Sequence, residues 1–428
     1  MLSKSPLLRS VPAVLSVAVG CALVWWAASV HSLDFNVYRA GAQAFLGLGG
    51  SAQLYDEKLW NIAGDAWLPF TYPPFAVLLF LPYAVMPAEM GAHIHSVILL
   101  MSLLAVVHLI ITRSKGIAGL LQRRTDWRAA VLPGLVVVLV GISGPWREGL
   151  SFGQINAALM AILLADLLGA RKMGLPRGLL TGLAAGVKLT PLALGLFFLA
   201  QRDFKALFWM AAGFFGSVAV GFTISAEGSV YYWTEALWTA SRVGTVDDMY
   251  NATLRSFTLH LGLPEHAATA LWIALSLAAV LCGYGAIRRL LAASEQLAAM
   301  GVAALVMLII SPISWYHHWV WFILLLPALA FPSQPVPRRV LRRRRIGAAA
   351  FYLLFLTSSY ALSLAYFGRI QGHGPWWMEL LSSIWLFAAV SAAAATITKD
   401  ARPSLRTPSD APPRVPREAT EQPSGRAG

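Results

Sequence analysis

Apolar runs long enough to cross a membrane follow one another along most of this chain, separated by short polar segments. Because a helix rises about 1.5 Å per residue, roughly 20 apolar residues cover the hydrocarbon layer of a bilayer. Ten runs near this length occur, at about 11–30, 92–112, 129–145, 153–170, 206–225, 267–287, 297–314, 317–331, 346–367 and 376–397. The pattern predicts an all-α polytopic membrane protein, with residues 1–398 forming one transmembrane domain of about ten full transmembrane helices.

Polar segments between the runs differ in charge. Lys and Arg concentrate in the segments 113–128, 171–177, 202–205, 288–289 and 338–345. Cytoplasmic loops of membrane proteins carry an excess of Lys and Arg. These five segments are therefore predicted to be cytoplasmic, together with both chain termini.

The apolar stretch 178–200 has a basic residue at each end, Arg177 and Arg202. If both ends are cytoplasmic, the stretch cannot cross the membrane once. We therefore predict one broken half-helix pair that enters the membrane and returns, broken around residues 186–191. Pro191 supports this break because it has no N–H to donate and biases the preceding residue away from helix. Non-helical backbone at membrane depth is tolerated where protein or a wet cavity covers it.

The segments predicted on the outer side are 31–91, 143–148 and 226–266. The first is rich in proline and aromatic residues, and we expect interfacial helices there, because one more span would place 113–128 outside. The tail 399–428 is rich in Pro, Arg and Ser and is predicted to be disordered and cytoplasmic.

Composition agrees with a membrane protein. The 428 residues are 57% hydrophobic and only 12% charged, with a mean hydropathy of +0.63, whereas soluble domains carry about 25% charged residues. The net charge of +13 does not indicate nucleic-acid binding, since the Arg cluster at 338–345 lies between two apolar runs and suits anionic lipid headgroups. The first 30 residues resemble a signal peptide, but Trp25 and Trp26 suit an interfacial anchor, so we expect a retained first helix.

Asp34 is the leading candidate for catalysis. It follows the first apolar run, in the segment LDFNVYRAG at 33–41. A carboxylate at the mouth of a membrane protein, beside Tyr38 and Arg39, can serve as a general base. The alternative is a solvated carboxylate at a helix end. Arg39 can pair with Asp34 or with a phosphate.

The segment SPISWYHHW at 311–319 places His317 and His318 at the outer end of a run. Neighbouring residues on a helix point about 100° apart, so the two do not form a chelating pair by themselves. Histidine can donate to a phosphate or take part in proton transfer. The alternative is that the aromatic residues of this segment anchor it at the interface and the histidines are incidental.

Lys188 is a cation in an apolar stretch, which is costly unless it faces a cavity or a partner. It can pair with an anionic phosphate, or form a structural pair with Asp203 or Glu148. The amides of Gln154, Asn156 and Asn251 can bind sugar hydroxyls or tie helices together. No P-loop, dinucleotide fingerprint or HExxH motif occurs. We expect no cofactor, and a divalent metal stays open because no carboxylate pair has clear ligand spacing.

Taken in order, these motifs resemble the actinobacterial polyprenyl-phosphate-sugar-dependent glycosyltransferases of the GT-C fold, glycosyltransferase family 87. The matching pieces lie at 34–41, 54–56, 70–75 (FTYPPF), 153–156 (GQIN), 186–191 (GVKLTP), 251–254 (NATL) and 311–318. They extend over about two-thirds of the chain. Each piece is weak alone, and the ordered set is fairly specific.

The resemblance implies a glycosyltransferase in the plasma membrane, with its active site on the outer, periplasmic face. The donor would be polyprenyl-phosphate-mannose and the acceptor a glycolipid: phosphatidylinositol mannoside, lipomannan or lipoarabinomannan, joined by an α-1,2 linkage. The catalytic Asp of the family maps onto Asp34 and its histidine pair onto His317 and His318. The expected site places Asp34, His317 and His318 in catalysis, Arg39, Lys188 and Tyr72 at the donor phosphate, and Gln154, Asn156 and Asn251 at the sugar or acceptor, with no metal.

Two other functions stay open, the first through the same family resemblance. Polyprenyl-phosphate-arabinose-dependent arabinofuranosyltransferases also carry the segment at 72–74, although their match to 311–318 is poorer. A lipid or solute transporter would place its substrate at the broken helices of 178–200, but no repeated halves occur in the sequence.

Overall fold

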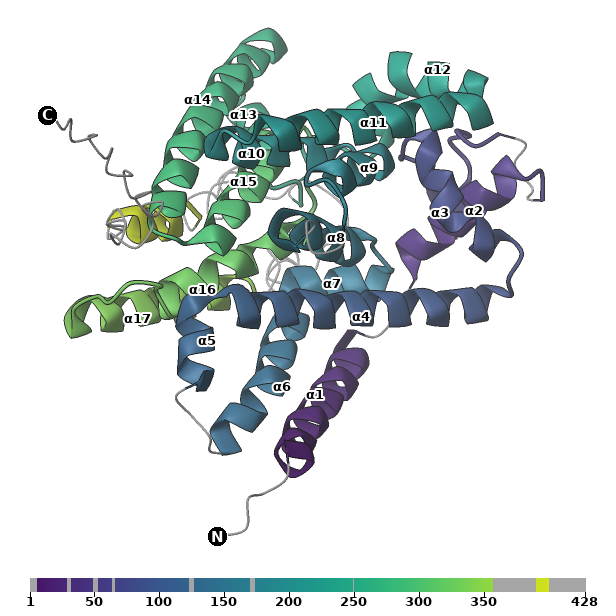
Figure 1. Ribbon diagram of the computed structural model, residues 1–428. Helices are drawn as coiled ribbons and strands as arrows, with labels where there is room; N and C mark the ends of the chain where they lie inside the picture. The colour runs from purple at the N-terminus through teal and green to yellow at the C-terminus, as the bar shows by residue number, and fades with distance from the viewer. Residues whose placement is uncertain are drawn as a thin grey trace, which may run out of the picture.

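The structure is a computed structural model, and it describes residues 6–28, 32–48, 53–63, 66–122, 127–169, 174–248, 250–356 and 390–399. Helices pack side by side through most of it (Figure 1). The tail 400–428, predicted to be disordered, lies outside the described residues, and so does most of the predicted run at 376–397.

The first half of the chain contains α1 (Pro6–Ala28), α2 (Leu33–Phe45), β1 (Trp60–Ala63), β2 (Ala66–Leu68), η1 (Pro74–Ala76), α3 (Val77–Ala84), α4 (Ala88–Arg113), α5 (Lys115–Gln122), α6 (Trp127–Ile142), α7 (Gly144–Phe152), α8 (Asn156–Gly169), α9 (Leu179–Val187), η3 (Thr190–Leu194) and α10 (Gly195–Gln201). The second half contains α11 (Phe204–Ile224), α12 (Ala226–Thr234), η4 (Ala236–Trp238), η5 (Ala240–Arg242), α13 (Leu254–His260), α14 (Glu265–Ala292), α15 (Gln296–Ile310), η6 (Tyr316–Leu324), α16 (Leu325–Ala330) and α17 (Arg338–Leu354). A further helical stretch covers 390–399.

Among the described residues, three helices are long and apolar enough to cross a membrane: α4, α11 and α14. They coincide with predicted runs. Helices α6 and α7 form a fourth candidate that bends by 73°; α6 overlaps the run predicted at about 129–145, and α7 begins in the segment 143–148 that was predicted on the outer side. Other predicted runs correspond to apolar helices of 10–17 residues, and a 14-residue helix is only about 21 Å long. Spanning helices are therefore confirmed, and the expected number of about ten full spans is not.

Helix α1 packs closely along α6. Gly134 and Gly141 face α1 so tightly that a Cβ atom at either position would clash with Ser16 or Val24. Small residues let helix backbones approach in this way, which is a common mode of association in membranes. The first apolar run is therefore an integral part of the packed structure.

The segment expected to hold interfacial helices contains α2 and α3, as predicted, and also a β-hairpin. Strands β1 and β2 pair antiparallel, with Trp60 opposite Leu68 and Asn61 opposite Trp67. The all-α prediction is wrong here. Strands of 4 and 3 residues are too short for an alternating pattern to appear in the sequence, although tryptophan favours paired strands.

The stretch 178–200 is broken where the sequence predicts it. Helix α9 ends at Val187, and Lys188 has an extended backbone with φ −145° and ψ 124°. The two ends of the stretch meet, because Arg177 and Asp203 form a salt bridge of 2.8 Å between Nη1 and Oδ2. The chain thus enters and returns to the same end. Asp203 is consequently not the partner of Lys188.

Asp166, a fully buried carboxylate on α8, fixes the start of this pair. It accepts hydrogen bonds from the Gly178 and Thr181 backbone N–H groups at 2.9 and 2.8 Å, and from the Thr181 hydroxyl at 2.6 Å. The first N–H groups of a helix have no partner within it, and a carboxylate satisfies them and complements the helix dipole. Helix α9 therefore begins at a defined point on α8.

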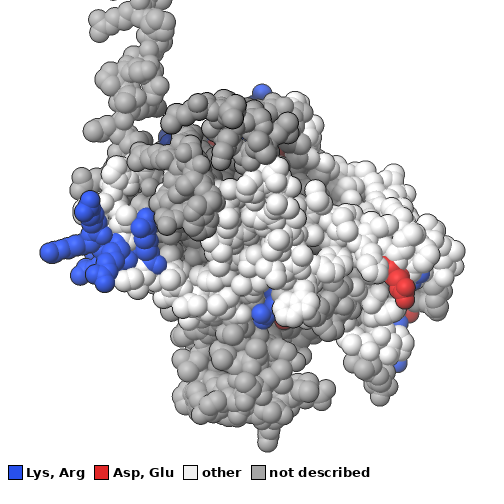
Figure 2. All heavy atoms as spheres, turned by 90° about the horizontal axis from the view of Figure 1, so that it is seen from below, with Lys and Arg blue, Asp and Glu red and all other residues white. Residues whose placement is uncertain are grey.

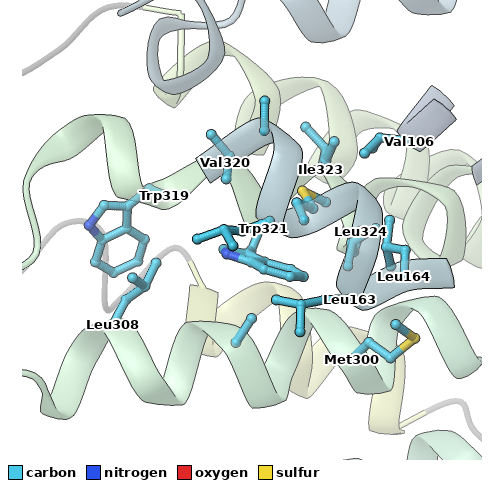
Figure 3. Close-up of a cluster of buried hydrophobic side chains, with 14 of the residues drawn as sticks. Val106, Leu163, Leu164, Met300, Leu308, Trp319, Val320, Trp321, Ile323 and Leu324 are labelled. Atoms are coloured by element: carbon cyan, nitrogen blue, oxygen red, sulfur yellow. The ribbon is translucent and has the colours of Figure 1, made fainter. Parts of the chain in front are cut away.

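The core lies between α4, α8, α15 and η6 (Figure 3). Each of the four elements contributes apolar side chains that meet in the close-up: Val106, Leu163, Leu164, Met300, Leu308, Trp319, Trp321 and Leu324. The Trp146 indole of α7 donates to the Val320 carbonyl at 3.1 Å, which ties the bent pair to this core.

Basic loops lie close to one another. Figure 2 shows Lys and Arg gathered at the end of the molecule where Figure 1 places α17. Gly116 of α5 contacts the backbone of Phe331, and the Ser333 N–H donates to Glu295 at 2.6 Å. The start of the basic segment 113–128 thus meets the chain just before 338–345, which is bonded in turn to the chain just after 288–289.

Candidate functional site

A cavity of about 810 Å³ is enclosed by segments that are far apart in the sequence. Its walls come from α2, the segment 68–73, α7, the break at 188–193, the segment 232–250 and the end of α15 through 318. Ligand pockets commonly have volumes of about 300–1,000 Å³. Six of the nine expected site residues line it: Asp34, Tyr72, Gln154, Lys188, His317 and His318.

Asp34 lies in the first turn of α2, where the helix dipole favours a negative charge. Its carboxylate forms a side-chain hydrogen bond with Gln154. The Gln154 amide oxygen already accepts from the Tyr38 and Tyr72 hydroxyls, at 2.8 and 3.0 Å. The Gln154 amide nitrogen is therefore the group that donates to Asp34. A buried network thus fixes the direction in which the carboxylate faces the cavity.

Burial raises the pKa of Asp34 from its usual 3.8 to about 7, although the Lys188 charge and the Gln154 hydrogen bond act in the opposite direction. The shift has the expected sign, because removal from water disfavours the charged carboxylate. A pKa near neutrality suits a group that accepts a proton in a reaction and later releases it.

Lys188 occupies the break between α9 and η3, so its side chain enters the cavity from the tip of the broken pair. Its Nζ donates to Asn156 Oδ1 at 2.9 Å and lies 3.4 Å from His318 Nε2. Its Nζ also lies 5.5 Å from the centre of the Tyr72 ring, within cation–π range. A cation with polar and aromatic neighbours in a cavity is a ready anion site. The alternative pairing with Glu148 has no support among these contacts.

Both histidines line the cavity. They belong to the 3₁₀ segment η6, and their rings lie 4.6 Å apart at 88°. His317 Nδ1 is 3.9 Å from Glu148 Oε2, whereas His318 lies beside Lys188. The two rings therefore have different neighbours: His317 is near a carboxylate and His318 is near an ammonium group.

Three expected site residues lie elsewhere. Arg39 donates to Gln43 at 3.3 Å and to the Met86 carbonyl at 3.2 Å, which joins α2 to the end of α3. It is not part of the cavity lining, and its expected role at the donor phosphate has no support in this geometry.

Asn251 is fully buried outside the lining. It donates to the Val246 and Pro312 carbonyls at 2.7 and 2.8 Å and accepts from the Ser314 N–H at 2.8 Å. It joins two loops that border the cavity, and it does not face a ligand. Asn156 does not line the cavity, and its Oδ1 accepts the hydrogen bond from Lys188.

Glu148 also lines the cavity, although the sequence pointed to it only as a possible partner of Lys188. Tyr38 and Arg242 also line the cavity. The periodicity of α7 is a usable signal for Glu148, because Glu148 and Phe152 stand four residues apart on one face while Trp146 is buried on another. Within the described ranges, no group of three or more His, Cys, Asp or Glu side chains is arranged to hold a metal ion.

Comparison with known proteins adds an independent line of argument. The model of glycosyltransferase family 87 matches residues 70–312, more than half of the chain. A polyprenol-phosphate-mannose-dependent alpha-(1-2)-phosphatidylinositol mannoside mannosyltransferase of Mycolicibacterium smegmatis is 33% identical, over 72% of this chain and 71% of that protein.

Two further relatives cover more of the chain. The polyprenol-phosphate-mannose-dependent alpha-(1-2)-phosphatidylinositol pentamannoside mannosyltransferase of M. smegmatis is 32% identical, over 90% of each chain. A phosphatidylinositol mannoside mannosyltransferase of Mycobacterium tuberculosis, also polyprenol-phosphate-mannose-dependent, is 30% identical over 86% of each. This chain therefore belongs to glycosyltransferase family 87.

Proposed function

We propose that this protein is a membrane mannosyltransferase that moves mannose from polyprenyl-phosphate-mannose to a phosphatidylinositol mannoside. The observation that carries the proposal is one cavity holding both a carboxylate with a raised pKa, Asp34, and a cation, Lys188, with the His318 ring beside it. Group transfer from a phosphate-linked sugar needs both: a base for the acceptor and positive charge for the leaving group.

Asp34 acts as the general base. It removes the proton from the acceptor hydroxyl as the oxygen attacks the anomeric carbon of the donor, and the bond from that carbon to the phosphate oxygen breaks. Attack from the opposite face inverts the configuration, so a β-linked donor gives an α-linked product. One carboxylate is sufficient, because a polyprenyl phosphate leaves without needing a proton from a second acid.

Lys188 and His318 receive the leaving phosphate, with the Tyr72 ring beside the Lys188 ammonium. The hydrogen bond from Lys188 to Asn156 fixes the ammonium where the charge on the phosphate develops. Such fixed charges stabilise a transition state more than mobile water does. In the cavity wall, His317 lies between His318 and Glu148.

The acceptor is a phosphatidylinositol mannoside, extended through an α-1,2 linkage. The relatives named for phosphatidylinositol mannoside and for phosphatidylinositol pentamannoside are 33% and 32% identical, so identity favours neither acceptor length. The three relatives described above all carry mannose in their names. This supports mannose over arabinose, and family membership supports an enzyme over a transporter.

Transfer of label from polyprenyl-phosphate-[¹⁴C]mannose tests the proposal. The purified protein is reconstituted with phosphatidylinositol carrying short or long mannose chains, and the lipid products are separated and digested with linkage-specific mannosidase. We expect a labelled product that α-1,2-mannosidase degrades. Transfer from polyprenyl-phosphate-arabinose alone, or movement of donor across the bilayer without product, would refute the proposal.

We also propose that the cavity opens to the periplasmic face and that both termini, 113–128 and 338–345 are cytoplasmic. The distribution of Lys and Arg supports this orientation. Single cysteines, placed in a background in which Cys21 and Cys282 are serine, are treated in intact cells with an impermeant reagent. Position 247 should be labelled and position 342 protected; the reverse result would overturn the orientation.

The rate of transfer should fall as the pH is lowered through about 7. The base must be deprotonated to act, and the pKa of Asp34 is raised to about 7, so protonation removes activity below that value. The pH dependence of kcat/KM, measured on the unaltered protein, checks this. A limb centred near pH 4, the usual range of an exposed carboxyl, would contradict the assigned burial of Asp34.

A further inference from the structure

Glu148 is a carboxylate that the mechanism above does not use, although it lines the same cavity as Asp34. Its Oε2 atom is buried and has no hydrogen-bond partner. The nearest side-chain nitrogen, His317 Nδ1, is 3.9 Å away, which is too far for a hydrogen bond. A buried carboxylate oxygen without a donor is costly, and native structures seldom retain one without a reason.

Helix α7 holds Glu148 firmly in this position. The Gly144 N–H donates to the Phe355 carbonyl at 2.6 Å, and the Trp146 indole donates to the Val320 carbonyl at 3.1 Å. The opposite face of the helix is buried through Trp146 and Leu150. With the helix anchored on that face, Glu148 is directed into the cavity.

We propose that Glu148 accepts a hydrogen bond from a hydroxyl group of the sugar being transferred, and so helps to select that sugar. This inference rests on the proposed function. A carboxylate accepts hydrogen bonds and donates none when ionised, and the hydroxyls of a hexose are matching donors. In its ionised form Glu148 repels a phosphate, so the sugar hydroxyls are the better match.

The neighbours of Glu148 favour the donor sugar over the acceptor. Glu148 lies beside His317, whose ring stacks edge-on against His318, and His318 lies 3.4 Å from Lys188. If Lys188 and His318 hold the donor phosphate, the sugar bonded to that phosphate is the ligand group closest to this wall. Glu148 is then a specificity residue that touches substrate, with Asp34 facing the acceptor.

Donors that lack a single hydroxyl test the proposal. The unaltered protein and Glu148→Gln are assayed with polyprenyl-phosphate-mannose and with its 2-deoxy, 3-deoxy, 4-deoxy and 6-deoxy analogues. We expect Glu148→Gln to lower kcat/KM for the complete donor by about 10- to 100-fold, the range of a hydrogen bond to a charged group. With one of the deoxy donors, the two proteins should have the same kcat/KM.

An equal loss with every donor would overturn the proposal. It would mean that Glu148 affects the stability of the fold or the electrostatic field of the cavity and does not bind one hydroxyl. Unchanged kcat/KM with the complete donor would also overturn it. Glu227→Gln is the matched control, because it removes a carboxylate that is exposed outside the cavity, and it should behave as the unaltered protein does.

A second variant and one measurement on the unaltered protein keep the result interpretable. Glu148→Asp retains the charge but withdraws the oxygen by one methylene, so it should show the same dependence on one hydroxyl if Glu148→Gln fails to fold. Transfer by the unaltered protein from the complete donor tests the proposed function itself. Normal transfer there, with no hydroxyl dependence in either variant, would refute only the role of Glu148.

Discussion

Replacing Asp34 by asparagine should abolish sugar transfer while leaving the protein folded in the membrane. Asparagine has the same shape and can still bond to Gln154, but it cannot take a proton from the acceptor. Loss of a general base typically lowers the rate by about 10²–10⁴-fold, or roughly 3–5 kcal/mol in the barrier. Initial rates of the purified variant, together with its melting temperature, measure both parts of the prediction.

Binding of a non-reactive donor analogue is the internal control for this variant. Asp34 acts on the acceptor, so Asp34→Asn should retain the donor affinity of the unaltered protein. Near-normal turnover would refute the role of Asp34 as base. Lost donor affinity with an intact fold would place Asp34 at the donor and reverse the roles of the two sides of the cavity.

Replacing Lys188 by glutamine should weaken donor binding. Glutamine keeps a polar group near Asn156 and His318 but removes the positive charge that faces the phosphate. A hydrogen bond between charged groups is worth about 1.5–3 kcal/mol, so the dissociation constant of the donor analogue should rise about 10- to 100-fold. His318→Ala should act in the same direction with a smaller effect, because its ring contributes one donor and no fixed charge.

Lys205→Gln is the matched control for Lys188, because it removes an exposed lysine at the start of α11 that does not line the cavity. It should bind the donor analogue normally. The assignment fails if Lys188→Gln and Lys205→Gln have equal donor affinity. A loss of acceptor affinity alone in Lys188→Gln would instead place the cation beside the acceptor.

Much of the fold could be predicted from the sequence because the bilayer leaves few choices for an apolar run. Helices α4, α11 and α14 are uniform enough to be found by length alone. The broken pair was predictable from charge, since Arg177 and Arg202 flank one apolar stretch that also contains Pro191. Short helices and the bend between α6 and α7 were not, because tertiary packing and not local hydropathy decides where an apolar run turns.

The site residues also fall into those that could be predicted from the sequence and those that could not. Asp34, Lys188 and the histidine pair are polar groups in apolar surroundings, which is a visible anomaly in a sequence. Arg39 and Asn251 have the same appearance, yet their hydrogen bonds go to backbone carbonyls within loops and between helices. Only three-dimensional contacts separate a residue that faces a ligand from one that satisfies the backbone. Glu148 was missed because its distinguishing feature, a buried carboxylate oxygen without a hydrogen-bond donor, is visible only in three dimensions.

The salt bridge between Arg177 and Asp203 has a consequence for anyone mapping this protein by hydropathy. A plot of apolar peaks would count the stretch between these residues as one crossing and would reverse the sidedness of everything that follows. His318 would then be drawn on the opposite surface from Asp34, although the two border one cavity. In the proposed orientation the returning segment adds no crossing, so the number of crossings between Asp34 and His318 stays even and both residues lie on the same side.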